Sequence, residues 1–209
     1  MKRWLIAAVP ALVACTVPDA PSHLGGYPFA HVSGGIFHWP ANRLPVRFWA
    51  DPRGNMNALV QNAIDVWQDQ FMYGEFTGVL VSDSAHADVQ FTWSDSVPPA
   101  VAADPGPPVK ACGGNTQPDS TDANGQIWGA FHSGITILLV GATPGQVEAC
   151  VRRTVIHEMG HGLGILNDNA PDSTDIMYFT PLVPVPSAAD RTTIQTLYHT
   201  TPNWLPPVR

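Results

Sequence analysis

The amino-acid sequence predicts an α+β fold, in which a twisted mixed sheet packs on two long helices. Short segments that alternate apolar and polar residues predict strands, and two longer segments with apolar residues at helical spacing predict helices. These segments follow the order strand, helix, several strands, helix. The 21 Pro and 18 Gly residues further indicate many loops and few long helices.

The first predicted strand and helix occupy residues 44–50 and 56–71. Leu44, Val46 and Phe48 alternate with less apolar neighbours, and the Asp-Pro-Arg-Gly sequence that follows is typical of a turn. Asn55 then stands where a helix cap is expected. The apolar residues that recur at helical spacing, and that we expect in the core, are Met56, Leu59, Val60, Ala63, Ile64, Trp67 and Phe71.

The middle of the chain is predicted to form further strands and one long loop. The strands are expected at 76–81, 89–93, 127–131 and 135–140. Residues 94–126 lack any periodicity, and loops of this length inside a compact domain are usually functional. The Asp, Asn and Gly residues at 119–125 offer hard oxygen ligands that suit Ca²⁺, and solvent-exposed turns are the alternative interpretation.

The second long helix is predicted from Thr143 to Leu163, and it carries the most specific motif of the chain. Thr143-Pro-Gly-Gln resembles a capping box with proline at the first helical position. Residues four apart lie on one face of a helix, so His157 and His161 can direct two imidazoles at one metal ion. Glu158 then lies where a general base for a water molecule is needed.

This His-Glu-x-x-His motif is hard to attribute to chance. The chain has 8 His and 3 Glu among 209 residues. The expected number of random matches is then roughly 0.004. The alternative is a pair of structural core histidines.

The N-terminus is predicted to be a targeting segment. Lys2 and Arg3 precede a short apolar run that is too short to span a membrane. The run ends in Leu-Val-Ala-Cys15, which resembles the lipobox of bacterial lipoproteins, and this resemblance implies cleavage before Cys15 and acylation of its thiol. An ordinary secretory signal is the alternative. We therefore expect an exported protein, either an outer-membrane or cell-surface lipoprotein or an extracellular or periplasmic one.

The predicted organisation has three parts. Residues 1–14 form the signal peptide, residues 15–36 a tether rich in Pro, Gly and Ser, and residues 37–209 a single domain. Loss of the signal changes the net charge from −7 to about −9 at pH 7. The chain contains no basic run, so nucleic acid is excluded as an expected partner, and we expect a monomer.

The chain has three cysteines, and lipidation of Cys15 would leave Cys112 and Cys150. In an oxidising compartment, Cys112 and Cys150 are expected to form a disulfide, which would tie the long loop to the second long helix. The alternative is a free Cys112 that blocks the metal, as a cysteine switch does in some proteases. The Arg-Cys-Gly context of such a switch is absent.

Together, these motifs resemble a known family of zinc proteases. The segment from His157 to Gly164 resembles the opening of the metzincin signature in its matrixin branch, and the residues around Met177 are similar to the Met-turn of that family. Residues 187–198 resemble its closing helix, so the expected fold is metzincin-like with a C-terminal helix after the Met-turn. The resemblance implies a zinc-dependent metalloendopeptidase that hydrolyses proteins or peptides, with Met177 beneath the metal and an extended substrate along an edge strand near 129–133.

The third metal ligand is where this chain departs from the family. Matrixins have His three residues after the glycine, whereas this chain has Asn167, followed by Asp168. A carboxylate is a good zinc ligand and a neutral amide a poor one, and some relatives use Asp. We therefore predict Asp168 as the third ligand, with Asn167 as the alternative. More remote candidates are Asp172, His132 and His199.

Two functions remain open from the sequence. The first is an exported, membrane-anchored zinc endopeptidase in which Glu158 activates the water. The second is a catalytically impaired, metzincin-fold binding lipoprotein whose third metal ligand is degenerate. Retention of Glu158 favours the first, and the replacement of histidine by Asn167 favours the second.

Overall fold

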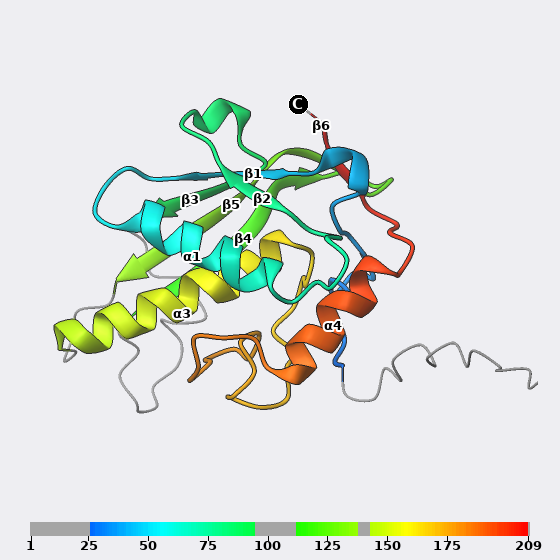
Figure 1. The fold of residues 1–209 in the computed structure, drawn as a ribbon. Coiled ribbons are helices and arrows are strands. Elements are labelled where there is room, and N and C mark those ends of the chain that lie inside the picture. The colour runs from blue at the N-terminus through cyan, green and yellow to red at the C-terminus, as the bar shows by residue number, and fades with distance from the viewer. Residues whose placement is uncertain (1–25, 95–111, 138–142, 209) are drawn as a thin grey trace, which may run out of the picture.

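A computed structural model describes residues 26–94, 112–137 and 143–208 of the chain (Figure 1). The predicted signal peptide, the lipid attachment residue Cys15 and the first part of the tether lie outside these described residues. Within the described helices, no segment is both long and apolar enough to cross a membrane.

The core of the fold is a mixed sheet. Its strands are β1 (Val46–Ala50), β2 (Gly78–Leu80), β3 (Val89–Trp93), β4 (Cys112–Thr121), β5 (Gln126–Ile137) and β6 (Leu205–Val208). The strand order is β2-β1-β3-β5-β4, and β6 also pairs with β5. Every pair is parallel except β4 with β5, so the predicted mixed sheet is confirmed.

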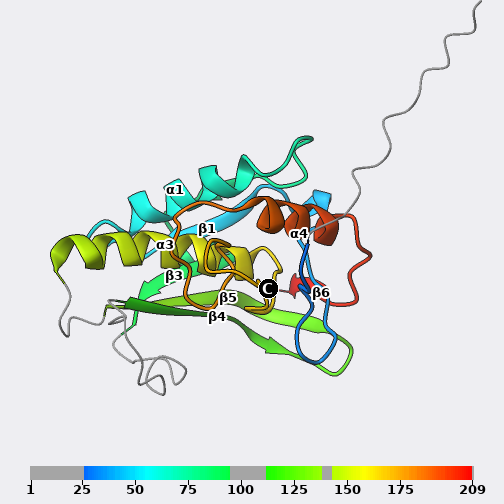
Figure 2. The same cartoon turned by 90° about the horizontal axis from the view of Figure 1, so that it is seen from below.

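Two long helices cover one face of this sheet, as predicted. They are α1 (Met56–Gln68) and α3 (Pro144–Gly162), and Figure 2 shows both on the same side of the strands. The indole of Trp67 joins them by donating to the carbonyl oxygen of Ile156 over 2.8 Å. The third helix is α4 (Ala188–Tyr198), and short 3-10 turns occur at η1 (Ala41–Arg43) and η2 (Ser84–His86).

The capping box predicted at Thr143 is confirmed, but the cap predicted at Asn55 is not, because Asn55 precedes α1 without a side-chain capping hydrogen bond. Thr143 and Gln146 form the predicted capping box, and Ser187 and Asp190 form another at the start of α4. The apolar face of α1 is buried. The largest fully buried side chains are Trp39, Trp67, Phe37, Phe48, Phe76, Phe91 and Phe131.

The prediction of a continuous loop from 94 to 126 is wrong for its second half. Cys112–Thr121 is a strand, β4, which pairs antiparallel with β5 and ends the sheet. Its residues are mainly polar or glycine, so the sequence shows no apolar alternation, although alternate residues from Gly114 to Pro118 are partly shielded from solvent. Pro118 is tolerated because β4 lies at the edge of the sheet.

The two strands predicted at 127–131 and 135–140 are also corrected. In the structure β5 runs without interruption from Gln126 to Ile137. It lies between β3 and β4, so residues 129–133 are not at an edge of the described sheet. The strand that offers a free edge beside α3 is β4.

The polar residues at 119–125 build the turn between β4 and β5. Asp122 accepts hydrogen bonds from the backbone amides of Asn124 and Gln126, at 2.8 and 3.0 Å. Asp119 accepts from the amide of Ala130 and lies 2.7 Å from the ring of His132. These contacts match the solvent-exposed turn and give no support to a calcium site.

The segment before Phe37, predicted as tether, packs on the domain from residue 26 onward. Tyr27 is buried, and its hydroxyl donates to Asp190 over 2.5 Å. The carbonyl oxygen of Phe29 accepts from the amide of Leu166 over 2.9 Å. A buried aromatic side chain and these backbone contacts therefore hold residues just before Phe37 against the domain.

The predicted disulfide is present in the structure. It joins Cys112, the first residue of β4, to Cys150 in α3, with 5.9 Å between their Cα atoms. Cys112 is therefore not a free thiol, and the cysteine-switch interpretation is wrong. The bridge ties the edge strand to the helix that carries the metal motif.

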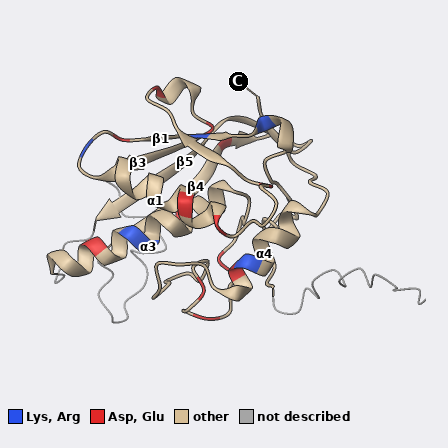
Figure 3. Ribbon diagram, viewed as in Figure 1, with Lys and Arg blue, Asp and Glu red and all other residues tan. Residues whose placement is uncertain are grey.

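Charged side chains are sparse on the described part of the chain. Figure 3 shows the basic residues, which are all Arg in the described part of the chain, on or near β1, on α3 and on α4, and no face of the described ribbon is made mainly of them.

Candidate metal centre

The helix carrying the motif ends in a sharp turn that requires glycine. Gly164 has φ +116, and a Cβ at this position would lie 2.0 Å from the carbonyl oxygen of Phe37. The amide of Gly164 donates to the carbonyl of His161, and the amide of Ile165 to that of Gly160, at 3.0 Å each. This pair of bonds is a Schellman cap, which reverses the chain and returns the following residues to the helix face.

The reversal brings three side chains together at the end of α3. The Nε2 atoms of His157 and His161 are 3.0 Å apart, and Oδ1 of Asp168 lies 3.1 Å from each of them. In a tetrahedral zinc site with bonds of 2.0–2.1 Å, neighbouring ligand atoms are roughly 3.3 Å apart. The three atoms therefore have nearly the mutual spacing of zinc ligands.

Backbone carbonyls fix how the two imidazoles are presented. Nδ1 of His157 lies 2.7 Å from the carbonyl oxygen of Ile176, and Nδ1 of His161 lies 2.6 Å from that of Ile165. A carbonyl only accepts, so each Nδ1 carries a proton, and Nε2 is the ring atom that can hold either a second proton or a metal ion. Two ring nitrogens and a carboxylate oxygen then face one another, an arrangement that a proton or a metal cation stabilises.

The pKa shifts of His161 and Asp168 agree with a site that a cation stabilises. Burial opposes the charged form of His161, but the hydrogen bond to Asp168 and the negative charge of Glu158 outweigh it and raise the pKa to about 9. Burial also opposes the charge of Asp168, yet hydrogen bonds from His157 and His161 hold its pKa well below the usual value. The site therefore attracts positive charge, whether a proton or a metal cation.

Glu158 lies beside the histidines but is held by the edge strand. The ligand atoms of His157, Glu158 and His161 all lie within 4.8 Å of one another, so one water could bridge the carboxylate and the ring nitrogens. Oε2 of Glu158 accepts a hydrogen bond from the hydroxyl of Thr116 in β4 over 2.7 Å. The carboxylate also occupies the space where a side chain at Gly114 would lie.

Met177 forms a buried floor under the helix. It is fully buried, and its sulfur would lie 2.3 Å from a Cβ added at Gly160, which stands between the two histidines. Asp190 of α4 is also fully buried and accepts from the backbone amides of Ile176 and Met177, at 2.7 and 3.2 Å. Because the carbonyl of Ile176 contacts His157, this carboxylate indirectly supports a ring of the cluster.

The other candidate ligands from the sequence lie elsewhere. Asn167 donates to the carbonyl of Ala30 over 2.7 Å and accepts from the amide of Asn169 over 3.1 Å, so both ends of its amide are engaged outside the cluster. Asp172 accepts from the backbone amide and hydroxyl of Thr174.

The two remote histidines are also engaged away from the cluster. His132 pairs with Asp119, and His199 lies against the backbone of its own helix, near Glu75. Neither ring is brought to His157 and His161.

The residues that support the cluster from other elements carry almost no signal in the sequence. Gly114, Thr116 and Ser133 lie in strands whose positions were not predicted or were predicted only in part. Tyr27 and Asp190 are joined by a contact that spans 163 positions. The capping position of Asp190 was the one local signal for this set.

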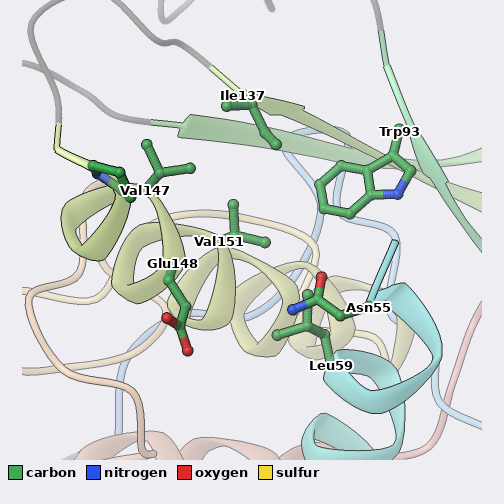
Figure 4. Close-up of a pocket in the computed structure, with 8 residues that line it drawn as sticks. Asn55, Leu59, Trp93, Ile137, Val147, Glu148 and Val151 are labelled. Atoms are coloured by element: carbon green, nitrogen blue, oxygen red, sulfur yellow. The ribbon is translucent and has the colours of Figure 1, made fainter. Parts of the chain in front are cut away.

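A separate hollow of about 450 Å³ lies away from this cluster, between the first turns of α3 and the start of α1 (Figure 4). Its wall is mostly apolar and includes Trp93 and Ile137, the side chains of which are shown in Figure 4. The chain next to these two residues, at 95–111 and 138–142, lies outside the described residues. The described residues around this hollow therefore do not indicate which ligand, if any, it binds.

Comparison with known proteins finds similarity among solved structures only. No protein-family model matches the chain, and no curated protein matches it. Among solved structures, the high choriolytic enzyme 1 of the medaka fish Oryzias latipes, a hatching enzyme zinc-protease, is similar with a TM-score of 0.45 and 13% sequence identity. The match covers 84% of this chain and 100% of that one. A likeness of this extent carries no information about chemistry, which has to come from the cluster at the end of α3.

Proposed function

We propose that this chain is a zinc-dependent metalloendopeptidase of the metzincin type. The observation that carries the proposal is the triangle formed by Nε2 of His157, Nε2 of His161 and Oδ1 of Asp168, with sides of 3.0, 3.1 and 3.1 Å. Glu158 stands beside it with a carboxylate available as a base. Three ligands and an adjacent carboxylate are what a catalytic zinc site requires, because the fourth position stays open.

The donor set fits zinc and fixes the roles of the ligands. His157, His161 and Asp168 would hold the ion, and Met177 would lie beneath it as the floor of the Met-turn. When bound, zinc polarises the scissile carbonyl and lowers the pKa of the attacking water. The carbonyls of Ile176 and Ile165 keep the two rings in the orientation that this binding needs.

Glu158 would act as the general base and then as the general acid. Its carboxylate takes a proton from the attacking water and delivers it to the nitrogen of the leaving amine. The contact with Thr116 holds one carboxylate oxygen in place during this transfer. Removal of the carboxylate should therefore abolish turnover without removing a metal ligand.

The substrate is proposed to be an extended peptide that adds to the free edge of β4. This strand ends the described sheet, is tied to α3 by the disulfide and contacts Glu158 through Thr116. Backbone hydrogen bonds to an edge strand hold a peptide largely independently of its side chains. Pro118 cannot donate, so we expect the pairing to involve residues 112–117.

The alternative is a binding protein with the same fold and a degenerate metal site. Asn167 would favour it if that residue occupied the third ligand position. Its amide is instead engaged with Ala30 and Asn169, and Asp168 faces the two histidines. These contacts favour the enzyme.

We also propose that the protein is exported and anchored through a lipid on Cys15. The support is the Leu-Val-Ala-Cys15 sequence at the end of the apolar run, together with the Cys112–Cys150 disulfide, which is typical of oxidising compartments. Mass analysis of the mature N-terminus tests this part by itself, since a free Cys15 thiol or a cleavage elsewhere would contradict it.

The enzyme assignment is tested with purified mature protein, zinc analysis and a Glu158→Gln variant. We expect one zinc per chain and cleavage of casein or a quenched peptide library by the wild type. Glu158→Gln should retain the zinc and lose activity by at least about 100-fold. The matched control is Glu148→Gln on the same helix, because Glu148 is exposed, pairs with Arg152 and lies away from the cluster.

The outcomes separate the two functions. Zinc binding with equal inertness of the wild type and Glu158→Gln would favour the binding protein. If the folded wild type does not bind zinc at saturating concentration, both the ligand assignment and the proposed enzymatic function are wrong.

A further inference from the structure

A pair of hydroxyl groups connects the sheet to Glu158. Thr116 lies in β4 and Ser133 directly opposite it in β5. Their oxygen atoms are 2.7 Å apart, and the Thr116 oxygen is also 2.7 Å from Oε2 of Glu158. Ser133 is fully buried, so its hydroxyl depends on this contact rather than on bulk water.

The direction of these hydrogen bonds follows from the number of protons. The Thr116 hydroxyl has two acceptors on Glu158, Oε2 at 2.7 Å and the backbone carbonyl oxygen at 3.2 Å. Neither can donate, so Thr116 gives its single proton to Glu158, and the nearer, charged Oε2 is the stronger acceptor. The oxygen of Thr116 is then free to accept the proton of Ser133. The result is a one-way chain from Ser133 through Thr116 to the carboxylate, and hydrogen bonds to an ionised acceptor are the stronger kind.

A glycine in the same strand clears the space that the carboxylate occupies. A Cβ added at Gly114 would lie 2.3 Å from Oε1 of Glu158 and 2.6 Å from its Cδ. The backbone of Gly114 has no left-handed conformation, so alanine there is allowed by the main chain. The clash would fall on the end of a flexible side chain, which would have to leave its position.

From this geometry we infer that Thr116 is a positioning residue for Glu158, supported by Ser133 behind it and by the open space at Gly114. The inference rests on the proposed function. By holding Oε2, Thr116 leaves Oε1 as the oxygen that takes the proton from the attacking water. β4 therefore both offers the proposed substrate edge and sets the geometry of the base.

A purely structural role for Thr116 gives a different expectation. If the hydroxyl only fastened β4 to α3, its loss would loosen the strand and weaken binding of a peptide to it, which raises KM. A positioning role lowers kcat and leaves KM and the zinc content near their wild-type values.

The test compares Thr116→Val, which keeps the shape and removes the hydroxyl, with Thr116→Ser, which keeps the hydroxyl. We expect Thr116→Val to lower kcat by about 10- to 100-fold, part of what a general base contributes. KM and zinc content should change less than about twofold, and Thr116→Ser should stay within about threefold of the wild-type kcat. Ser120→Ala is the matched control, since Ser120 is exposed in β4 beyond Pro118.

Gly114→Ala supplies a second variant if Thr116→Val does not fold. It keeps the hydroxyl of Thr116 but removes the space for the carboxylate, and we expect a comparable loss of kcat. Crystal structures of the metal-free wild type, Thr116→Val and Gly114→Ala provide a readout that does not depend on activity. Both variants should show the Glu158 carboxylate displaced from its place beneath β4.

The inference is overturned if Thr116→Val retains the wild-type kcat, if Thr116→Ser loses as much as Thr116→Val, or if the carboxylate stays in place in both variants. An inert wild type would contradict the proposed function instead, and the crystal structures would still decide whether Thr116 positions Glu158.

Discussion

The two sides of the candidate metal centre are held by different means. On the floor side, His157 and His161 are oriented by backbone carbonyls, and the turn that supplies one of them is fixed by the buried carboxylate of Asp190. On the strand side, Glu158 is oriented by a single side-chain hydroxyl, that of Thr116, in an edge strand. The proposed ligands therefore depend on the fold, whereas the proposed base depends on one strand.

This difference separates metal binding from turnover. A change on the floor side should disturb the ring of His157 and so reduce zinc affinity together with stability. A change on the strand side should leave the ligand triangle intact and reduce turnover alone. Four predictions test this division, and they follow in order of decreasing expected effect.

Asp190→Ala should have the largest effect. Asp190 accepts hydrogen bonds from the amides of Ile176, Met177 and Ser187 and from the hydroxyl of Tyr27. Each buried donor left without an acceptor costs about 1–3 kcal/mol, so the free energy of unfolding should fall by about 4 kcal/mol or more. Chemical denaturation and zinc titration measure the effect, and both stability and zinc affinity should decrease.

The control for Asp190→Ala is Asp172→Ala. Asp172 lies in the loop that contains Ile176 and Met177, but it is exposed, and its carboxylate contacts Thr174. We expect little change in stability or zinc affinity. If Asp190→Ala destabilises the fold but binds zinc as the wild type does, the floor side does not control the ligands.

Replacing both Cys112 and Cys150 by serine should have the next largest effect. The disulfide closes a sequence separation of 38, so its loss should lower the free energy of unfolding by about 3–4 kcal/mol. In the protein that remains folded, zinc affinity should stay within about threefold, because the bridge holds β4 rather than the ligands. Turnover should fall, because β4 carries Thr116. A loss of zinc affinity as large as that of Asp190→Ala would contradict the division into two sides.

The third prediction compares Asp168→Ala with Asn167→Ala. Mutation of a residue that only hydrogen-bonds to a metal ligand typically lowers metal affinity by about 10- to 100-fold. Asp168 is itself a proposed ligand, so Asp168→Ala should lower zinc affinity by at least about 100-fold. Asn167→Ala should cost about tenfold or less, since its amide holds Ala30. Competition with a chromophoric chelator measures both values, and the reverse ranking would identify Asn167 as the ligand.

Tyr27→Phe should have the smallest effect. It removes one hydrogen bond to the carboxylate of Asp190, which should lower the free energy of unfolding by about 1–2 kcal/mol. The three backbone amides still hold Asp190, so zinc affinity should not change measurably. Thermal unfolding and zinc titration test this. A tenfold loss of zinc affinity would show that the N-terminal segment belongs to the floor of the site.

The elements that could be predicted from the sequence are those with local signals. α1 follows from its apolar periodicity and α3 from its capping box. The turn after α3 follows from Gly164, whose positive φ a side chain would strain. By contrast, β4 becomes a strand only through its pairing with β5. Because β4 is mainly polar, it has no apolar alternation that would predict a strand. Its contact with Glu158 and its place in the strand order were therefore not predicted.

The sequence by itself determined the pair of imidazoles and the neighbouring carboxylate, because helical geometry fixes the relative directions of residues four positions apart. It also favoured Asp168, with Asn167 as the alternative, among the candidates for a third ligand. Only the tertiary structure decided that Asp168 rather than Asn167 faces the histidines, because that choice depends on where the turn meets Ala30. The support of Glu158 by Thr116 was likewise decided by strand pairing and by the packing of β4 on α3, contacts between residues far apart in the chain that no local pattern encodes.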